Sequence, residues 1–137
     1  AKLANLPEHP ITRGVKPMEI RDEWYFNIRF RPEMKGLTPI LNATPPDNVR
    51  KTDAAKAFPG REEILAWAFE RPDGGRSFGF TGGHFHKNWG DENFRRLVVN
   101  AILWTAHVDV PKDGAKVDMD PSELDRNLDR KPAPKNK

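Results

Sequence analysis

Two histidines at period-two spacing, His84 and His86, lie in a glycine-rich segment that also contains Trp89. The segment, residues 81–89, follows a strand-like run and precedes the most periodic helix of the chain. Ligands bind at the carboxyl ends of strands in α/β domains, so we predict the functional site here. On an extended backbone both imidazoles would point to one face, as a metal pair requires. The spacing therefore indicates candidate ligands for a divalent metal such as zinc, with a hydrogen-bonding loop pair as the alternative.

Two adjacent carboxylates and a third histidine are candidates to complete such a site. Asp22 and Glu23 point to opposite faces of a strand, or diverge by about 100° on a helix, so they cannot easily share one proton transfer. One carboxylate could act as an acid or base while the other caps a backbone or pairs with an arginine. The alternative is a polar entrance to a strand. His9 is either a third metal ligand or a turn residue that caps a helix start before Pro10.

Aromatic side chains near these groups could contact a sugar. Tyr25 and Trp89 combine an apolar ring with a polar edge, which suits the CH face and hydroxyl rim of a carbohydrate. The alternative for Trp89 is a plug that packs on the core. Trp67 and Trp104 lie inside apolar runs, and we predict that both belong to the core.

Hydrophobic periodicity predicts the strands that would position these residues. Pro39 predicts that the strand Leu37–Ala43 lies at a sheet edge or contains a bulge. The run Glu63–Glu70 is almost continuously apolar, which is typical of a strand buried on both faces, as in parallel sheets. An Arg-Pro-Asp-Gly-Gly sequence at residues 71–75 predicts a hairpin turn after it. The predicted strands are Phe26–Phe30, Leu37–Ala43, Glu63–Glu70 and Arg76–Thr81.

Helical periodicity is clearest after Asp91, the predicted N-cap, and extends to Thr105. Between the second and third strands, residues 44–60 form a polar loop. A short helix is predicted at Pro121–Leu128, with Ser122 as its cap. Residues 116–137 are rich in Asp, Lys, Pro and Asn, so we predict a polar, flexible tail there.

Composition limits the domain count and the class of partner. The 137 residues suffice for one domain, and 36% hydrophobic residues with 13 Pro and 10 Gly indicate a loop-rich chain with a small core. The net charge of +3 arises from 23 basic and 20 acidic residues that are interspersed, so we expect no nucleic-acid partner. No apolar run could span a bilayer and no secretion signal is visible, so we expect no membrane partner; the compartment stays open.

Several short motifs follow one another in an order that resembles the ThuA-like (trehalose utilisation) family, over residues 7–115. The resemblance implies a flavodoxin-like, three-layer α/β fold related to the class I glutamine amidotransferases, and a role in bacterial carbohydrate metabolism. The motifs are His9-Pro10-Ile11-Thr12-x-Gly14, Asp22-Glu23-x-Tyr25, Ala66-Trp67 before Gly75-Arg76, Gly83-His84 with Trp89, and Asn100-Ala101-Ile102-Leu103-Trp104.

Two departures from the family pattern qualify what the resemblance implies. The family's opening β and α units and glycine-rich loop are not found before the His-Pro-Ile-Thr motif. Residues 1–115 therefore resemble the C-terminal portion of such a domain, a fold incomplete on its N-terminal side. The chain has no cysteine, which excludes disulfides, thiolate zinc sites and the cysteine nucleophile of a glutaminase.

The leading hypothesis is a domain that binds or processes a small carbohydrate, such as a trehalose-like disaccharide or a keto-sugar. His84 is favoured over His86 as the acid, base or metal ligand, because only His84 matches the family pattern. The alternative is a non-catalytic structural or interaction domain of a larger carbohydrate protein; a homodimer is left open. The candidate catalytic residues are His84, Asp22 and His9, and the candidate binding residues are Tyr25, Glu23, Trp89 and Gly83.

Overall fold

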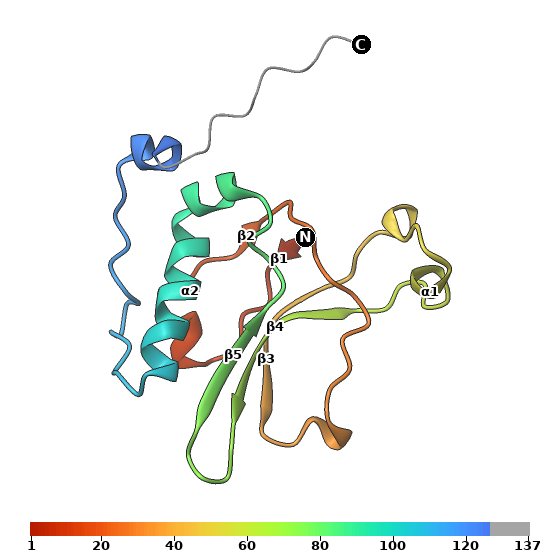
Figure 1. Ribbon diagram of the computed structural model, residues 1–137, viewed down its shortest axis with the longest axis horizontal. Helices are drawn as coiled ribbons and strands as arrows, with labels where there is room; N and C mark the ends of the chain where they lie inside the picture. Colours follow the sequence, from red (N-terminus) through yellow and green to blue (C-terminus); the bar gives the residue numbers. More distant parts are fainter. Residues whose placement is uncertain (127–137) are drawn as a thin grey trace.

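One long helix covers one face of a small sheet in the computed structural model, which describes residues 1–126 (Figure 1). The helix is α2 (Glu92–Thr105) and the sheet has the order β3-β4-β5. A second sheet pairs β1 (Lys2–Leu3) with β2 (Met18–Glu19). The strands of the larger sheet are β3 (Leu37–Ala43), β4 (Glu63–Glu70) and β5 (Arg76–Phe80).

The described residues form a mixed α/β domain. All strand pairs among them are antiparallel, so the expected parallel pairing is not seen. The remaining elements are short. No helix within residues 1–126 is long and apolar enough to cross a membrane. The short helices are η1 (Pro10–Thr12), η2 (Pro32–Met34), η3 (Asp47–Val49), α1 (Asp53–Lys56), η4 (His86–Gly90) and η5 (Pro121–Asp125).

Three predicted elements are confirmed at the sheet. β4 and β5 form the predicted hairpin, with Gly74 at a φ of 84° in its turn. β3 is an edge strand, and its register with β4 shifts between Pro39 and Leu41. The shift places two consecutive residues, Ile40 and Leu41, in the core, which a regular strand could not do because its side chains alternate.

The strand predicted at Phe26–Phe30 is wrong. The predicted alternation is present, since Phe26, Ile28 and Phe30 are half-buried while the residues between them are exposed. No strand within residues 1–126 pairs with this segment, however, because Asn27 adopts a left-handed φ of 56° and donates its backbone N–H to Glu63 Oε2 at 3.1 Å. Period-two burial therefore comes from a segment that packs against β4 without a ladder of hydrogen bonds.

β4 is not buried equally on its two faces. Ala66 and Ala68 are buried in the core, whereas Trp67 and Phe69 alternate with them and are only half-buried. The ring of Phe30 packs edge-on against Trp67, with centroids 5.1 Å apart. The prediction that Trp67 belongs to the core is therefore wrong, because the small alanines face the core in its place.

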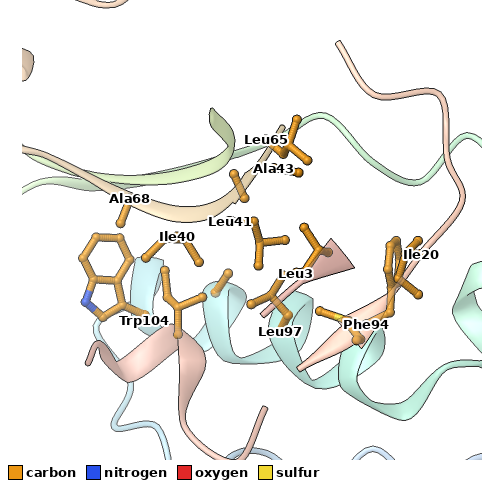
Figure 2. Close-up of a cluster of buried hydrophobic side chains, with 14 of the residues drawn as sticks. Leu3, Ile20, Ile40, Leu41, Ala43, Leu65, Ala68, Phe94, Leu97 and Trp104 are labelled. Carbon is orange, nitrogen blue, oxygen red and sulfur yellow. The ribbon is translucent and has the colours of Figure 1, made fainter. Parts of the chain in front are cut away.

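The core lies between α2 and the sheet, and α2 begins as predicted. The Asp91 side chain accepts the Phe94 N–H at 2.9 Å and so caps the helix. Figure 2 shows Leu97 and Trp104 in the core beneath the sheet. Trp104 is 4% exposed, so its predicted core position is confirmed. The core residues drawn with labels are Leu3, Ile20, Ile40, Leu41, Ala43, Leu65, Ala68, Phe94, Leu97 and Trp104.

Short helices interrupt the predicted loop and the C-terminal segment. Residues 44–60 contain η3 and α1. In place of the predicted helix at Pro121–Leu128 there is a short 3-10 helix, Pro121–Asp125. Its cap is Asp120, whose carboxylate accepts the Ser122 N–H; Leu128 lies outside the described residues. Two arginines of α2 hold the chain that follows the helix: Arg95 donates to Val117 O at 3.0 Å and Arg96 to Ala115 O at 3.2 Å.

Candidate functional site

The Asp22 carboxylate, on the segment that follows β2, holds the glycine-rich loop by hydrogen bonds. Its Oδ2 accepts the Gly83 N–H at 2.7 Å and the Asn88 side-chain amide at 2.9 Å. The Oδ1 atom accepts the backbone N–H groups of Glu23, His84 and Phe85 at 2.8, 3.0 and 3.3 Å. Five hydrogen bonds therefore converge on a carboxylate with about four lone-pair sites.

These hydrogen bonds set the charge state of Asp22. Partial burial on its own would raise the pKa of the Asp22 carboxyl, but the hydrogen bonds, led by that from Gly83, outweigh it and lower the pKa below its usual value. A carboxylate that is saturated with donors is a weak base. Of the roles expected for the two carboxylates, the surroundings of Asp22 favour capping of a backbone over proton transfer.

His84 and Glu23 form the exposed polar pair of the site. His84 Nδ1 lies 3.4 Å from Glu23 Oε2, and the two side chains are 59% and 60% exposed. The His84 ring also packs edge-on against Phe85, with centroids 5.1 Å apart. An imidazole beside a carboxylate can transfer protons to and from a bound hydroxyl or carbonyl group.

An open groove of 480 Å³ lies beside this pair. Its walls combine the two polar side chains with aromatic rings, including Tyr25, which is 59% exposed. Polar hydrogen-bonding groups beside aromatic faces are the combination that a sugar ring needs. The groove is lined by Glu23, Tyr25, Ile28, Trp67, Gly79, Phe80, Thr81, Gly82 and His84.

A second hollow of 340 Å³ shares Glu23 and Tyr25 with this groove and has a buried ion pair in its wall. Arg50 and Glu63, 3.4 Å apart, have side chains only 3% and 6% exposed. Arg50 also donates to Asp47 Oδ1 at 3.1 Å and to Arg61 O at 2.6 Å. Sequence reasoning missed this pair because its members lie 13 residues apart across a loop, and no local spacing links them.

A third hollow, of 770 Å³, is lined by Asp22 and is mainly apolar. Trp24 and Leu65 line both this hollow and the second one. Pro45 and Val49, from the loop after β3, overhang both hollows as well. Asp22 also lines both hollows.

His9 lies away from this site. It caps η1, because its Nδ1 accepts the Ile11 N–H at 3.2 Å, and its ring packs edge-on against Trp104 with centroids 5.0 Å apart. Trp104 is near the end of α2, whereas Asn88 and Asp22 meet before the start of that helix. The 14 residues of α2 span about 20 Å, so His9 does not join Asp22 and His84 in one pocket. The predicted alternative, a helix cap before Pro10, is the observed role.

Trp89 and His86 are also directed away from the groove. The Trp89 ring packs against Phe94 at 5.1 Å, as the predicted alternative of a core plug requires, and it does not line the groove. His86 Nε2 lies 2.9 Å from Leu124 O of η5. The backbone at His84 and His86 is not extended, since η4 begins at His86, so the expected common face is not formed.

Gly83 contributes backbone geometry and not a contact surface. Its φ of 103° strains any residue with a side chain, although the space around a Cβ there is open. Gly82, by contrast, has no room, because a Cβ would lie 2.6 Å from Phe80 Cζ and 2.7 Å from Trp24 Cζ3. Within residues 1–126 no group of three His, Asp or Glu side chains is placed to hold a metal ion.

The fold and the groove define a mixed α/β domain with an open imidazole–carboxylate pair. A model of the ThuA family, described as trehalose utilisation, matches residues 2–105, and the chain belongs to this family. The prediction drawn from the motif order is confirmed. ThuA is a glutamine amidotransferase-like family, and its description suggests a carbohydrate function related to trehalose utilisation. Neither the curated proteins nor the solved structures contain a significant match to the chain.

Proposed function

We propose that this ThuA domain binds a small sugar in the groove between Glu23, Tyr25 and His84 and exchanges protons with it. The observation that carries the proposal is the distance of 3.4 Å between His84 Nδ1 and Glu23 Oε2, in two side chains that are open to the groove. The carboxylate can orient the imidazole, and an oriented imidazole can give a proton to a sugar oxygen or take one from it. The aromatic surfaces of Tyr25 and Trp67 support contact with the CH face of the sugar.

The substrate class is a trehalose-like disaccharide or a keto-sugar. A keto-sugar supplies a carbonyl oxygen and an acidic neighbouring C–H, and both are suitable targets for an acid–base pair. A disaccharide supplies hydroxyl groups and a glycosidic oxygen. The groove of 480 Å³ has the size of an ordinary small-molecule site.

Calorimetric titration with trehalose and with a keto-disaccharide, followed by product analysis, tests the proposal. We expect His84→Ala and Glu23→Gln to weaken binding or turnover by about tenfold or more, since each removes a charge-assisted contact. The matched controls are His107→Asn and Glu62→Gln, which change exposed residues outside the groove. Unchanged binding and turnover in His84→Ala would remove His84 from the mechanism.

The second candidate function is a non-catalytic interaction domain of a larger carbohydrate protein. The large, mainly apolar hollow beside Asp22 and the structural roles of His9 and Trp89 favour it. If neither sugar binds at millimolar concentration and no product forms, this candidate replaces the first. The homodimer stays a prediction, which sedimentation of the purified chain tests.

Two further expectations stay predictions. A divalent metal such as zinc at His84 would appear in elemental analysis of the purified protein, and its removal would then reduce activity. The flavodoxin-like arrangement, with residues 1–115 as the C-terminal portion of the domain, is supported by family membership alone. The antiparallel pairing of the described strands gives it no support of its own.

A further inference from the structure

We infer that Asp22 and Asn88 are positioning residues that fix His84 against Glu23, an inference that rests on the function proposed above. Neither side chain lines the groove that contains the pair. Asp22 acts through the backbone of Glu23 and His84, and Asn88 acts through Asp22. The site would then depend on a polar core beneath the loop as well as on the side chains that meet the ligand.

A single carboxylate oxygen joins the two members of the pair. Asp22 Oδ1 accepts the N–H of Glu23 at 2.8 Å and the N–H of His84 at 3.0 Å. The two backbones are 61 residues apart in sequence, yet a common acceptor holds them within two hydrogen-bond lengths of each other. The Asp22 carboxylate therefore holds the backbones that carry the imidazole and the Glu23 carboxylate close together before any ligand binds.

Asn88 fixes the orientation of that carboxylate. It is 7% exposed, and its Nδ2 donates to Asp22 Oδ2 and to Arg21 O, both at 2.9 Å. The contact with the Arg21 carbonyl orients the amide, and the amide in turn directs Oδ2, leaving Oδ1 for Glu23 and His84. A buried amide with both contacts made is costly to disturb, because a lost partner leaves a desolvated polar group.

The glycines allow the loop to present consecutive N–H groups to one carboxylate. The Gly83 φ of 103° turns the chain so that the N–H groups of Gly83, His84 and Phe85 all point to Asp22. Gly82 packs against Trp24 and Phe80 and brings the loop close to the segment that follows β2. The loop, the carboxylate and the amide thus form one hydrogen-bonded unit.

Amide hydrogen exchange in the full chain tests this unit without any ligand. We expect Asp22→Asn to accelerate exchange at Gly83, His84 and Phe85 by about tenfold or more, because an amide nitrogen replaces one acceptor oxygen. Asn88→Ala should accelerate exchange at the same three sites. The double variant should add little to Asp22→Asn, because the two side chains act in series. Unchanged exchange, or fully additive effects, would overturn the inference.

Asp73→Asn is the matched control for this experiment. Asp73 also accepts a backbone N–H, from Gly75 at 3.0 Å, and an arginine contact, from Arg71 at 3.0 Å, but at the hairpin turn. Exchange at residues 83–85 should not respond to it. If Asp22→Asn does not fold, the same measurement on Asn88→Ala decides, since that change leaves the carboxylate in place.

The NMR resonances of the His84 ring distinguish a positioning role of Asp22 from a merely structural one. In the wild-type background, Glu23→Gln should shift these resonances, because the charged neighbour is lost. In the Asp22→Asn background the same change should have a much smaller effect, because the pair is no longer held together. An equal response in both backgrounds would overturn the positioning role. If this coupling is found but no sugar binds to the wild-type protein, the proposed function fails and the positioning stands.

Discussion

Gly14 and Gly114 lie against each other's backbone, and neither position has room for a side chain. A Cβ on Gly14 would overlap Asp113 O, and a Cβ on Gly114 would overlap Arg13 O. Both glycines also adopt left-handed φ values, 68° and 79°. The turn after η1 and the chain that leaves α2 therefore pack backbone to backbone.

Gly14→Ala should destabilise the domain by about 2 kcal/mol or more, because the new methyl group forces the two chains apart. Gly60→Ala is the matched control, since Gly60 has the same φ of 68° with open space around its Cβ. The control should cost about 1 kcal/mol, from backbone strain alone. Urea unfolding measures both, and equal losses would show that the close approach contributes nothing.

Asn100 links the same region through its side chain. It is fully buried, and its Nδ2 donates to Ile11 O at 3.0 Å and to Arg13 O at 2.9 Å, while its Oδ1 accepts the Ala115 N–H at 2.8 Å. Asn100→Ala should reduce the free energy of unfolding by about 2–4 kcal/mol, because three buried or partly buried backbone groups lose their partner. The exposed Asn48→Ala should change it by less than about 0.5 kcal/mol. A similar loss in both variants would contradict the role of Asn100.

His9 should make stability depend on pH near neutrality. Burial lowers the pKa of His9; Glu70 opposes the shift, and Arg76 and Arg13 add to it. The folded state therefore favours the neutral ring, whose unprotonated Nδ1 accepts the Ile11 N–H. This contribution is complete above the unfolded pKa of about 6.5 and is lost as the pH falls toward the lower folded pKa.

His9→Asn keeps a capping side chain without a titrating group, so it should reduce the stability difference between pH 7.5 and pH 5.5. Denaturant titration at the two pH values measures that difference. His107→Asn, at an exposed position, should leave it as in the wild type. The prediction fails if the His9 variant keeps the full wild-type difference.

Asp22 should act in a separate, more acidic window. Its folded pKa is depressed, so its contribution is present above the unfolded pKa of about 3.9 and is lost as the pH falls below it through the folded pKa. Asp22→Asn should cost about 1–3 kcal/mol at pH 7 and much less at pH 2.5. Asp118→Asn, on the exposed C-terminal segment, serves as the control in the same acid titration. A constant cost across this range would exclude the charged hydrogen bonds as its source.

Local patterns predicted the elements whose cause is local. The Asp91 cap, the apolar stripe of α2, the hairpin turn and the irregularity at Pro39 each depend on a few neighbouring residues, and all are confirmed. The alternation at Phe26–Phe30 was also correct as a burial pattern. It could not show that Asn27 turns left-handed and donates to Glu63 where a strand partner was expected.

The candidate site was predicted in part, for a related reason. The order of the motifs identified the family. Three of the motif residues, Asp22, Glu23 and His84, lie together in the structure. The order could not separate motif residues that meet the groove from those that hold the domain together, such as His9, because one chain contains both kinds. Burial and hydrogen-bond partners separate them, and these depend on contacts between distant segments.

The hydrogen bond from Asn100 Nδ2 to Ile11 O joins residues that are 89 positions apart, so it can form only late in folding. Figure 1 shows η1, in red, lying against the cyan α2. The hairpin of β4 and β5 can form early because its contacts are local. The packing of η1 requires α2 and Ala115, which are far from it in sequence. During synthesis the domain therefore stays incomplete until Ala115 has left the ribosome.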